Sequence, residues 1–286
     1  QRSSSEGTLS VEQPIQVPFL SSTLTPHLTL HHYDVEYHGS DDTWNFSLKH
    51  ELDLKLIQLD AWLRTGTAYK LPSFWQMFWV SSAFAEGDPT LKPEHSNDFE
   101  TGIRLSLKQA QEPWFSVRSY SQEYQDLITW KRGYGNRFYP VNLHSATISG
   151  LSFSSGLSLV ENHINISANH TITDPINQTP GPNSEGNYLP FRPLGNTSIN
   201  LDANFKTMLV SLTYHEQRRT YIREANTKWL DPFHKLDLAF SHRQSFPIFE
   251  LMTTLRIDNL SDKQYEVLER FPKPGRYSEI NLKIKF

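Results

Sequence analysis

Histidines are the residues of this chain best suited to metal or haem chemistry, because imidazole nitrogens are common metal ligands at neutral pH. The chain holds 12 histidines, including the adjacent His31 and His32 and the pair His163 and His170. No His-Glu-x-x-His motif, Gly-x-Ser-x-Gly elbow or glycine-rich phosphate loop accompanies them. There is also no cysteine to act as ligand or nucleophile. We therefore expect no metal site, no cofactor and no catalytic residue, with a hydrolase built from unplaced Ser, His and Asp as the open alternative.

An aromatic segment, residues 70–84, reads KLPSFWQMFWVSSAF. Its rings are close together in sequence, and no charged residue separates them. Such a segment can bind a flat ligand, or it can form the core of a long loop or part of the aromatic girdle of a membrane protein. Both interpretations stay open. The candidate ligand-binding residues are Phe74, Trp75, Phe78 and Trp79.

A second candidate segment, residues 130–139, reads WKRGYGNRFY and combines cations with aromatic rings. Guanidinium and ammonium groups beside aromatic rings suit an anionic ligand. The same composition suits contact with lipopolysaccharide or a solvated loop, so the ligand-binding interpretation is one of three. Its candidate residues are Lys131, Arg132, Tyr134 and Arg137.

The elements that must position these segments are β-strands, because apolar and polar residues alternate along most of the chain. In residues 98–107, DFETGIRLSL, the apolar face alternates with Glu100, Arg104 and Ser106. The same period occurs in 57–64, 198–205, 235–240, 249–257 and 278–286. No helix of useful length is predicted. We expect about thirteen strands of roughly ten residues, the length of a tilted membrane strand.

The connections between these strands alternate in length. The sequence predicts short turns at 109–113, 154–156, 205–207 and 244–247. It predicts longer loops at 66–97, 174–190, 223–231 and 259–275, and it places 131–136 at the same end as these. Short turns at one end and long loops at the other are typical of an outer-membrane β-barrel.

The composition agrees with a β-barrel in lipid. Mean hydropathy is only -0.54, yet 13% of the residues are aromatic, as expected when every second strand residue meets the bilayer. No run of the sequence approaches the ~18 apolar residues of a membrane helix. The net charge of -4 offers no basic surface for nucleic acid. A soluble β-sandwich binding module with one wet face is the alternative, since it also produces alternation.

The C-terminal sequence NLSDKQYE…FPKPGRYSEINLKIKF resembles the terminal signature of TonB-dependent outer-membrane transporters. That signature runs Asn-Leu-Phe-Asp-Lys-x-Tyr, then a loop, then Pro-Gly-Arg and an aromatic residue, and it ends on Phe. Ser261 replaces the usual Phe. We expect the matching residues to build the barrel rather than to bind a ligand. They are Asn259, Leu260, Asp262, Lys263, Tyr265, Pro274, Gly275, Arg276, Tyr277 and Phe286.

Two internal segments carry the same resemblance. GTAYKLPSFWQMF is similar to the family's Gly-x-x-Tyr-Arg-x-Pro segment. GDPTLKPEHSNDFETGIRL is similar to its Asn-Pro-x-Leu-Lys-Pro-Glu motif, with Asp88 in place of Asn. The matching residues, again expected to be structural, are Pro72, Pro89, Leu91, Lys92, Pro93, Glu94, Glu100 and Gly102.

The resemblance implies that residues 1–286 are the C-terminal thirteen or so strands of a 22-stranded barrel, without its plug domain. It implies an outer-membrane receptor, not an enzyme, that takes up a ferric siderophore or similar chelate with energy supplied through TonB. TonB would act through an N-terminal part absent from this chain. The terminal strand would contact the barrel-assembly machinery, and the C-terminus would be periplasmic. A passive porin-type channel is the functional alternative.

Overall fold

The computed structural model describes residues 4–17, 21–35, 39–161 and 163–286. Almost all regular structure in these ranges is β-strand. The two helical segments are α1 (Phe74–Phe78) and a 3-10 turn, η1 (Tyr134–Asn136). No helix among the described residues is long and apolar enough to cross a membrane. The strands are β1 (Ser4–Glu12), β2 (Ile15–Val17), β3 (Ser22–Val35), β4 (Gly39–Asp53), β5 (Ile57–Lys70), β6 (Glu94–Leu107), β7 (Trp114–Arg132), β8 (Phe138–Leu159), β9 (Ile164–Asn177), β10 (Gly195–Phe205), β11 (Met208–Gln217), β12 (Thr220–Tyr221), β13 (Trp229–Leu230), β14 (Phe233–Ser245), β15 (Glu250–Asp258), β16 (Glu266–Leu268), β17 (Phe271–Pro272) and β18 (Tyr277–Lys285).

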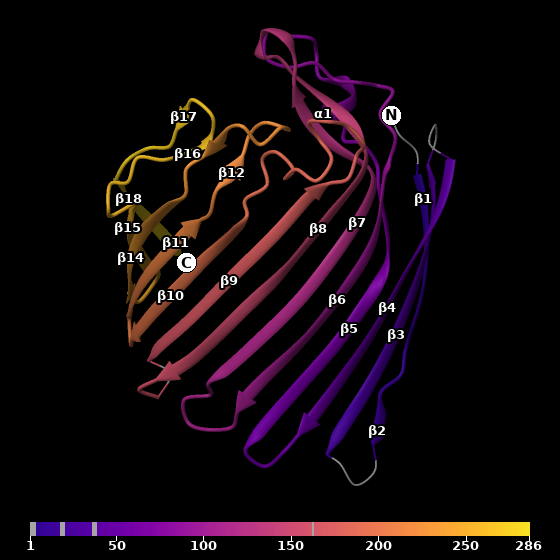
Figure 1. The fold of residues 1–286 in the computed structure, drawn as a ribbon. Coiled ribbons are helices and arrows are strands. Elements are labelled where there is room, and N and C mark those ends of the chain that lie inside the picture. The colour runs from indigo at the N-terminus through magenta and orange to yellow at the C-terminus, as the bar shows by residue number, and fades with distance from the viewer. Residues whose placement is uncertain (1–3, 18–20, 36–38, 162) are drawn as a thin grey trace.

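One antiparallel sheet of 14 strands contains most of these elements (Figure 1). Its neighbours follow the order β1-β3-β4-β5-β6-β7-β8-β9-β10-β11-β14-β15-β18, and β2 adds to β3. The small pairs β12-β13 and β16-β17 lie in the connections between these strands. The predicted all-β antiparallel architecture is confirmed. The soluble sandwich is wrong, because the described residues form one continuous sheet rather than two packed sheets.

The pairing register gathers apolar side chains on one face of the sheet. Leu201, Leu212, Leu238 and Ile257 are neighbours across four strands. The next row of residues on the same face is also apolar, and many side chains of this face are exposed. Because successive residues of a strand point to opposite faces, the polar residues between them occupy the other face. A sheet with this division has one face suited to lipid and one to water.

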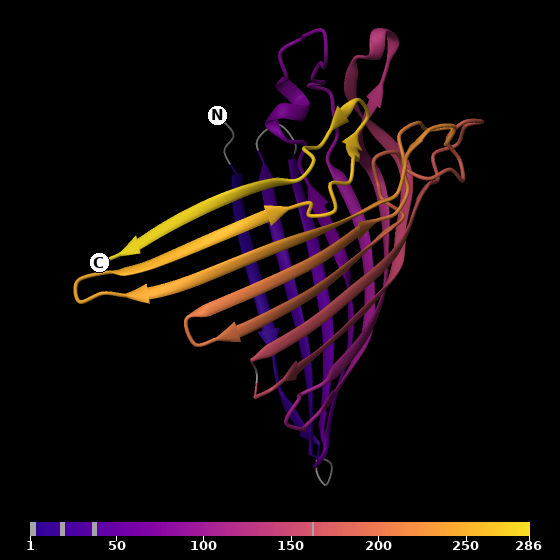
Figure 2. The same cartoon turned by 90° about the vertical axis from the view of Figure 1, so that its left-hand side faces the viewer.

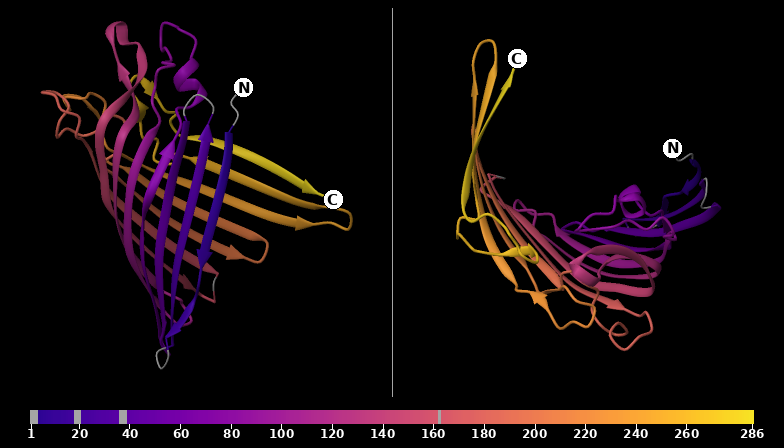
Figure 3. Two further views of the ribbon diagram at one scale, coloured as in Figure 1. Left: turned by 90° about the vertical axis from the view of Figure 1, so that its right-hand side faces the viewer. Right: turned by 90° about the horizontal axis from the view of Figure 1, so that it is seen from above.

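The sheet is strongly curved, and seen from above its strands follow an open arc with the two termini on separate arms (Figures 2 and 3). The hollow side carries the polar face. Cavities of about 600 and 550 Å³ on it are lined by charged and polar residues, including Arg64, Glu100 and Arg118. The apolar face is therefore convex. β1 and β18 form the two edges of the described sheet.

The connections have different lengths at the two ends of the sheet. We call the end with residues 71–93, 133–137, 178–194, 218–232 and 259–276 the long-loop end, and it is uppermost in Figure 1. The opposite, short-turn end holds 54–56, 108–113, 160–163, 206–207 and 246–249. The predicted alternation of short and long connections is confirmed except at the β7–β8 hairpin, whose connection 133–137 is shorter than 108–113 at the opposite end.

Two details of the predicted layout are wrong. Residues 154–156 are not a turn, since Ser154, Ser155 and Gly156 pair with β7 inside the 22-residue strand β8. The small residues Ser-Ser-Gly resemble a turn, but here the glycine leaves room for the indole of Trp114. The strands are also not uniform, because β7 has 19 residues and β8 has 22 and both continue beyond their neighbours at the long-loop end.

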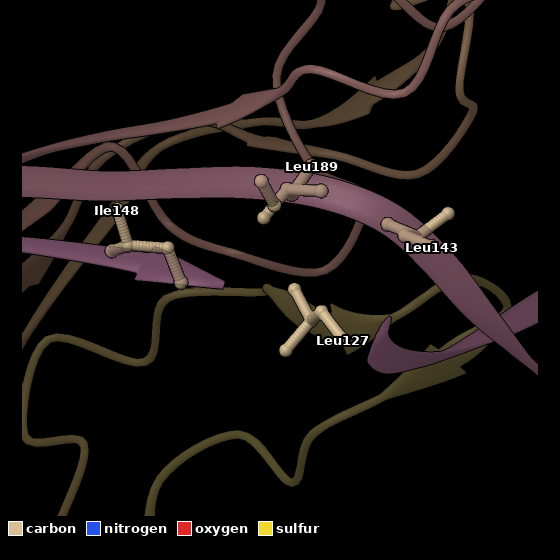
Figure 4. Close-up of a cluster of buried hydrophobic side chains, with 5 residues drawn as sticks. Leu127, Leu143, Ile148 and Leu189 are labelled. Carbon is tan, nitrogen blue, oxygen red and sulfur yellow. The ribbon is translucent and has the colours of Figure 1, made fainter. Parts of the chain in front are cut away.

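A small hydrophobic core forms where this long hairpin meets loop 178–194. It contains Leu127, Leu143, Ala146, Ile148 and Leu189, and Figure 4 shows the four larger side chains converging from the hairpin and the loop. All five are at most 7% exposed. The loop is therefore anchored to the wall by apolar burial, rather than being free in solvent.

Three aromatic side chains on the polar face each lie across a glycine of the adjacent strand. Trp62 is opposite Gly102, and Trp114 and Tyr120 are opposite glycines of β8 in the same way. A Cβ atom added to Gly102 would lie 2.2 Å from the Trp62 ring. Glycine is thus required at this position because a large ring occupies the space of a side chain.

We expect the substitution Gly102→Ala to destabilise the complete gene product by about 1–3 kcal/mol, the usual cost of overpacking. Gly7→Ala is the matched control, because a Cβ atom at Gly7 meets no atom within 4 Å. Urea unfolding in detergent, followed by tryptophan fluorescence, measures the difference. Equal unfolding midpoints for the two variants would contradict the packing argument.

Candidate functional site

The predicted aromatic segment forms α1 and the residues after it, at the long-loop end. Ser73 caps the helix, accepting the Gln76 N–H at 3.2 Å, while the Gln76 side chain accepts the Ser73 N–H at 2.7 Å. This reciprocal capping box explains why so short a segment is helical. Met77 is 7% exposed and anchors the helix. Pro72, which precedes the helix, is also buried.

The three aromatic side chains of α1 and that of its C-cap residue, Trp79, are instead exposed. Phe74 and Phe78 have ring centroids 4.9 Å apart, and Trp75 and Trp79 have theirs 5.2 Å apart, as expected for residues four apart on a helix. Their exposed fractions run from 73% at Phe74 to 40% at Trp79. The loop-core interpretation is therefore wrong for these rings. They form an exposed aromatic surface, which we call the α1 patch.

The second predicted segment does not form a free cationic surface. Lys131 and Arg132 lie in β7 rather than in the loop, and Tyr134 in η1 is fully exposed. Lys131 is 2.7 Å from Glu224, Arg132 pairs with Glu269, and Arg137 is 3.0 Å from Glu86. These three acidic residues belong to three connections. The cations are thus neutralised, and they tie loops together.

Glu269 is the most highly connected residue of this loop network. Its carboxylate accepts from Arg132 and from Lys228 at 2.5 Å, and its side chain is only 10% exposed. Hydrogen bonds from Lys228 and Arg132 lower the pKa of Glu269 to about 2. The residue therefore stays ionised and joins hairpin β7–β8 to loops 218–232 and 259–276.

Hydrogen bonds to backbone carbonyls extend the same network. The N–H of Phe138 donates to the carbonyl of Phe84, and the N–H of Glu86 donates to the carbonyl of Phe138. Asn226 donates to the carbonyl of Tyr188 at 2.9 Å and so links loops 218–232 and 178–194. Hairpin β7–β8 is therefore the common support of the long loops, including the loop that carries the α1 patch.

Glu100, which the sequence predicts to be structural, contacts three side chains on the polar face of the sheet. Its carboxylate accepts from the Trp62 indole at 2.9 Å and from Arg118 at 3.3 Å, and Arg64 is 3.5 Å away. Arg104 lies over the Trp114 ring at 4.2 Å. Sequence reasoning missed Trp62, Arg104 and Arg118 as parts of one surface, because only the register brings them together.

The remaining motif residues have visible structural contacts. Buried Glu94 accepts the Ile128 N–H at 3.1 Å and pairs with Lys70, which fixes the beginning of β6. Buried Asn259 bonds to the carbonyl and N–H of Lys263 at 2.9 and 3.0 Å. Asp262 accepts the Arg276 N–H at 2.8 Å. Asn259 and Asp262 thus satisfy local backbone groups at the loop, as expected from their side chains.

Other motif residues pack or stay at the surface. Tyr265 stacks on Phe233 with ring centroids 4.1 Å apart, and Leu91 is buried. Lys92 donates its N–H to Asn142 at 2.9 Å. Leu260 donates its N–H to the carbonyl of Leu236 at 2.6 Å. Terminal Phe286 is 93% exposed, beside Phe249.

The histidines do not assemble a metal centre in the part of the chain that the structure describes. His32 bonds to Asp42 at 2.6 Å, and His31 bonds to Thr8 at 3.1 Å. His163 bonds to the carbonyl of Val160, and His170 to Thr197 at 2.9 Å. Each of these histidines therefore has a local polar partner.

Comparison with known proteins agrees with this architecture. The chain is 27% identical over 252 residues to the vitamin B12 transporter BtuB of Vibrio vulnificus (strain YJ016), a match that covers 87% of this chain and 37% of that protein. It is 26% identical over 242 residues to the vitamin B12 transporter BtuB of Photobacterium profundum, covering 83% and 37%. The chain thus spans little more than a third of these relatives.

Solved structures share the fold at low identity. The copper transporter OprC superposes with a TM-score of 0.67 at 16% identity, over 96% of this chain and 47% of that one. The siderophore receptor PirA from Acinetobacter baumannii gives 0.66 at 19% identity, over 98% and 45%. Residues 17–260 match the family described as TonB dependent receptor-like, beta-barrel. That match covers most of the chain and most of its antiparallel sheet. The protein therefore belongs to the TonB-dependent receptor β-barrel family.

Proposed function

We propose that this chain is the C-terminal barrel portion of an outer-membrane receptor for TonB-coupled uptake of a scarce nutrient. The proposed ligand is a ferric siderophore or similar metal chelate. The family match is the observation that supports uptake. The exposed rings of the α1 patch support a ligand that has a flat apolar surface. Relatives described as transporters of vitamin B12 and copper and as a siderophore receptor leave the ligand class open to test.

The prediction that the chain is not an enzyme is confirmed by its family, whose members are receptors. We propose further that the long-loop end is extracellular and the C-terminus periplasmic. Exposed aromatic rings on the loops then face the medium, where a ligand arrives. The terminal strand would serve the barrel-assembly machinery from the periplasmic side.

Closure of the barrel supports the proposal that further strands belong to the complete protein. In lipid, each unpaired backbone group at the β1 and β18 edges would cost several kcal/mol. Strands outside residues 1–286 would pair with both edges, and a plug in the hollow would make contact with TonB. The intact mass and N-terminal sequence of the protein isolated from its membrane test this directly.

Uptake by cells that produce the complete gene product tests the function. We expect them to accumulate at least one of three labelled ligands, a ferric catecholate, a ferric hydroxamate or cyanocobalamin, about tenfold above cells without the gene. TonB-deficient cells should lose this accumulation. Equal accumulation with and without TonB would instead favour the passive porin-type channel.

The α1 patch is tested by the double substitution Trp75→Ala and Phe78→Ala. Two aromatic contacts of about 0.5–1.5 kcal/mol each predict roughly a tenfold rise in the ligand concentration for half-maximal uptake. Val80→Ala is the matched control, since Val80 is 83% exposed in the same loop but is not aromatic. An unchanged concentration dependence in the double variant, at equal surface abundance, would show that the patch does not bind the ligand.

The Glu269 network predicts a pH dependence of loop order. Its folded pKa of about 2 lies below its ordinary value of 4.5, so its stabilisation is complete above pH 4.5 and is lost as the pH falls from 4.5 through 2. At pH 7, Glu269→Gln should raise amide exchange in loops 218–232 and 259–276 about tenfold, since each bond to a charged group contributes ~1.5–3 kcal/mol.

Hydrogen-exchange mass spectrometry of the complete gene product measures this effect. Glu185→Gln is the control, because Glu185 is exposed in loop 178–194 and has no ion pair within the described residues. Exchange that rises equally in both variants, or in neither, would mean that Glu269 does not hold the loops.

A further inference from the structure

Charge is unevenly distributed over the hollow side of the sheet. The strands β8, β9, β10 and β11 lie side by side (Figure 1). Within 152–158, 165–173, 196–202 and 211–217, their hollow-side residues are serine, threonine, asparagine, glutamine or glycine, with two exceptions. The exceptions are Asp202, near the short-turn end, and His215, beside β14. We call the hollow side of these four ranges the neutral stripe.

The register aligns the neutral stripe in rows that cross all four strands. One such row consists of Gly156, Ser167, Asn200 and Thr213. Neighbouring rows are two residues further along each strand, so they are about 7 Å apart. From Ser152 to Ser158 the stripe extends about 20 Å along β8. Short polar groups therefore repeat at a regular spacing between the long-loop end and the short-turn end.

Both flanks of the neutral stripe are charged. On one side, Arg64 and Arg118 surround Glu100 on strands β5, β6 and β7. On the other side, Lys235 of β14 is 2.6 Å from Asp237 on the same strand. The neutral stripe is thus four strands wide and lies between two surfaces that hold ion pairs.

The short side chains of the stripe leave open space in front of it. A cavity of about 740 Å³ is lined by Gly156, Ser167 and Asp202 of the stripe. Arg104 and Trp114 of the neighbouring strands line the same cavity. The hollow therefore has room for a solute beside the neutral stripe at the short-turn end.

The hydroxyl groups of the stripe keep capacity for further hydrogen bonds. Those of Ser152 and Thr171 are 3.0 Å apart, and that of Thr173 is 3.1 Å from the hydroxyl of Tyr120. A hydroxyl group has one donor and two acceptor sites. Each of these groups can therefore bond to its neighbour and also bind water or a ligand.

We propose that the ligand crosses the hollow along the neutral stripe, to which it presents amide and hydroxyl groups. Passage requires binding that is favourable enough for entry, yet weak and repeated enough for exit. Hydrogen bonds to ionised groups are roughly twice as strong as neutral ones, so a ligand held on the charged flanks would leave slowly. On the stripe, an equivalent set of partners lies about 7 Å further on, and new bonds form as the old ones break.

This inference rests on the proposed uptake function, and it concerns transit rather than the first capture of the ligand. The α1 patch lies in the connection between β5 and β6, whereas the stripe begins at β8. Changes in the stripe should therefore lower the rate of uptake and leave capture at the cell surface unchanged.

The test compares two serine-to-tryptophan variants of the complete gene product. Ser198 lies in the neutral stripe, and Ser47 is a partly buried serine on the hollow side of β4, opposite Arg64. The probe is whichever labelled compound wild-type cells accumulate, among a ferric catecholate, a ferric hydroxamate and cyanocobalamin. We expect Ser198→Trp to lower its maximal uptake rate about tenfold, because the indole fills the passage, and Ser47→Trp to leave the rate unchanged.

Asn169→Arg is the second variant, because it places a fixed charge in the stripe beside Ser198. It should also lower the maximal rate, and it decides the test if Ser198→Trp fails to show heat-modifiable migration on gels. Binding of the probe to TonB-deficient cells should be equal in all variants.

A wild-type rate in the folded stripe variants would overturn the inference, as would an equal loss of rate in Ser47→Trp. Loss of surface binding together with rate would overturn it in favour of a role in capture. If wild-type cells accumulate none of the three compounds, the proposed uptake function fails, and this inference fails with it.

Discussion

The backbone ladder of the single sheet is the constraint on which the rest of the structure depends. In a bilayer each strand must satisfy its N–H and C=O groups on its neighbours, because no water is present to do so. The long pairings here meet that demand, with β3–β4 and β5–β6 each matched over 14 residue pairs. A continuous ladder imposes a period of two on the side chains. Every strand therefore contributes alternately to a lipid face and to a polar wall.

That constraint leaves little conformational freedom on the strands, so we propose that ligand recognition takes place at the loops and in the hollow. The loops have only one small apolar core among the described residues, and they depend on the long β7–β8 hairpin for support. Ion pairs from Lys131, Arg132 and Arg137 reach three different connections. The long loops thus share one support, because the same hairpin contacts each of them.

The sequence predicted what depends on local chemistry. Alternation gave the strands, turn residues such as Asn259 and Asp262 were placed at a loop, and three motifs indicated the family. It could not predict the turn after β8, because Ser154-Ser155-Gly156 has turn composition while its glycine in fact accommodates Trp114. It also could not predict that Arg132 meets Glu269, since the partners are 137 residues apart in sequence. Charge pairing between loops depends on the tertiary structure, so it cannot be predicted from the positions of cationic residues in the sequence.

The exposed side chains at the long-loop end divide into two classes with different causes. The four rings of the α1 patch are exposed although the helix is capped and anchored by Met77, so their exposure is a consequence of a stable local structure rather than of poor packing. Large contiguous apolar surfaces are uncommon on proteins unless something covers them. On the convex side, Arg218 and Arg219 have no carboxylate partner among the described residues, although acidic residues are abundant in the same loops. The α1 rings belong to the connection between β5 and β6, and the two arginines follow β11. The same end of the sheet therefore exposes two surfaces, one made of aromatic rings and one that contains Arg218 and Arg219.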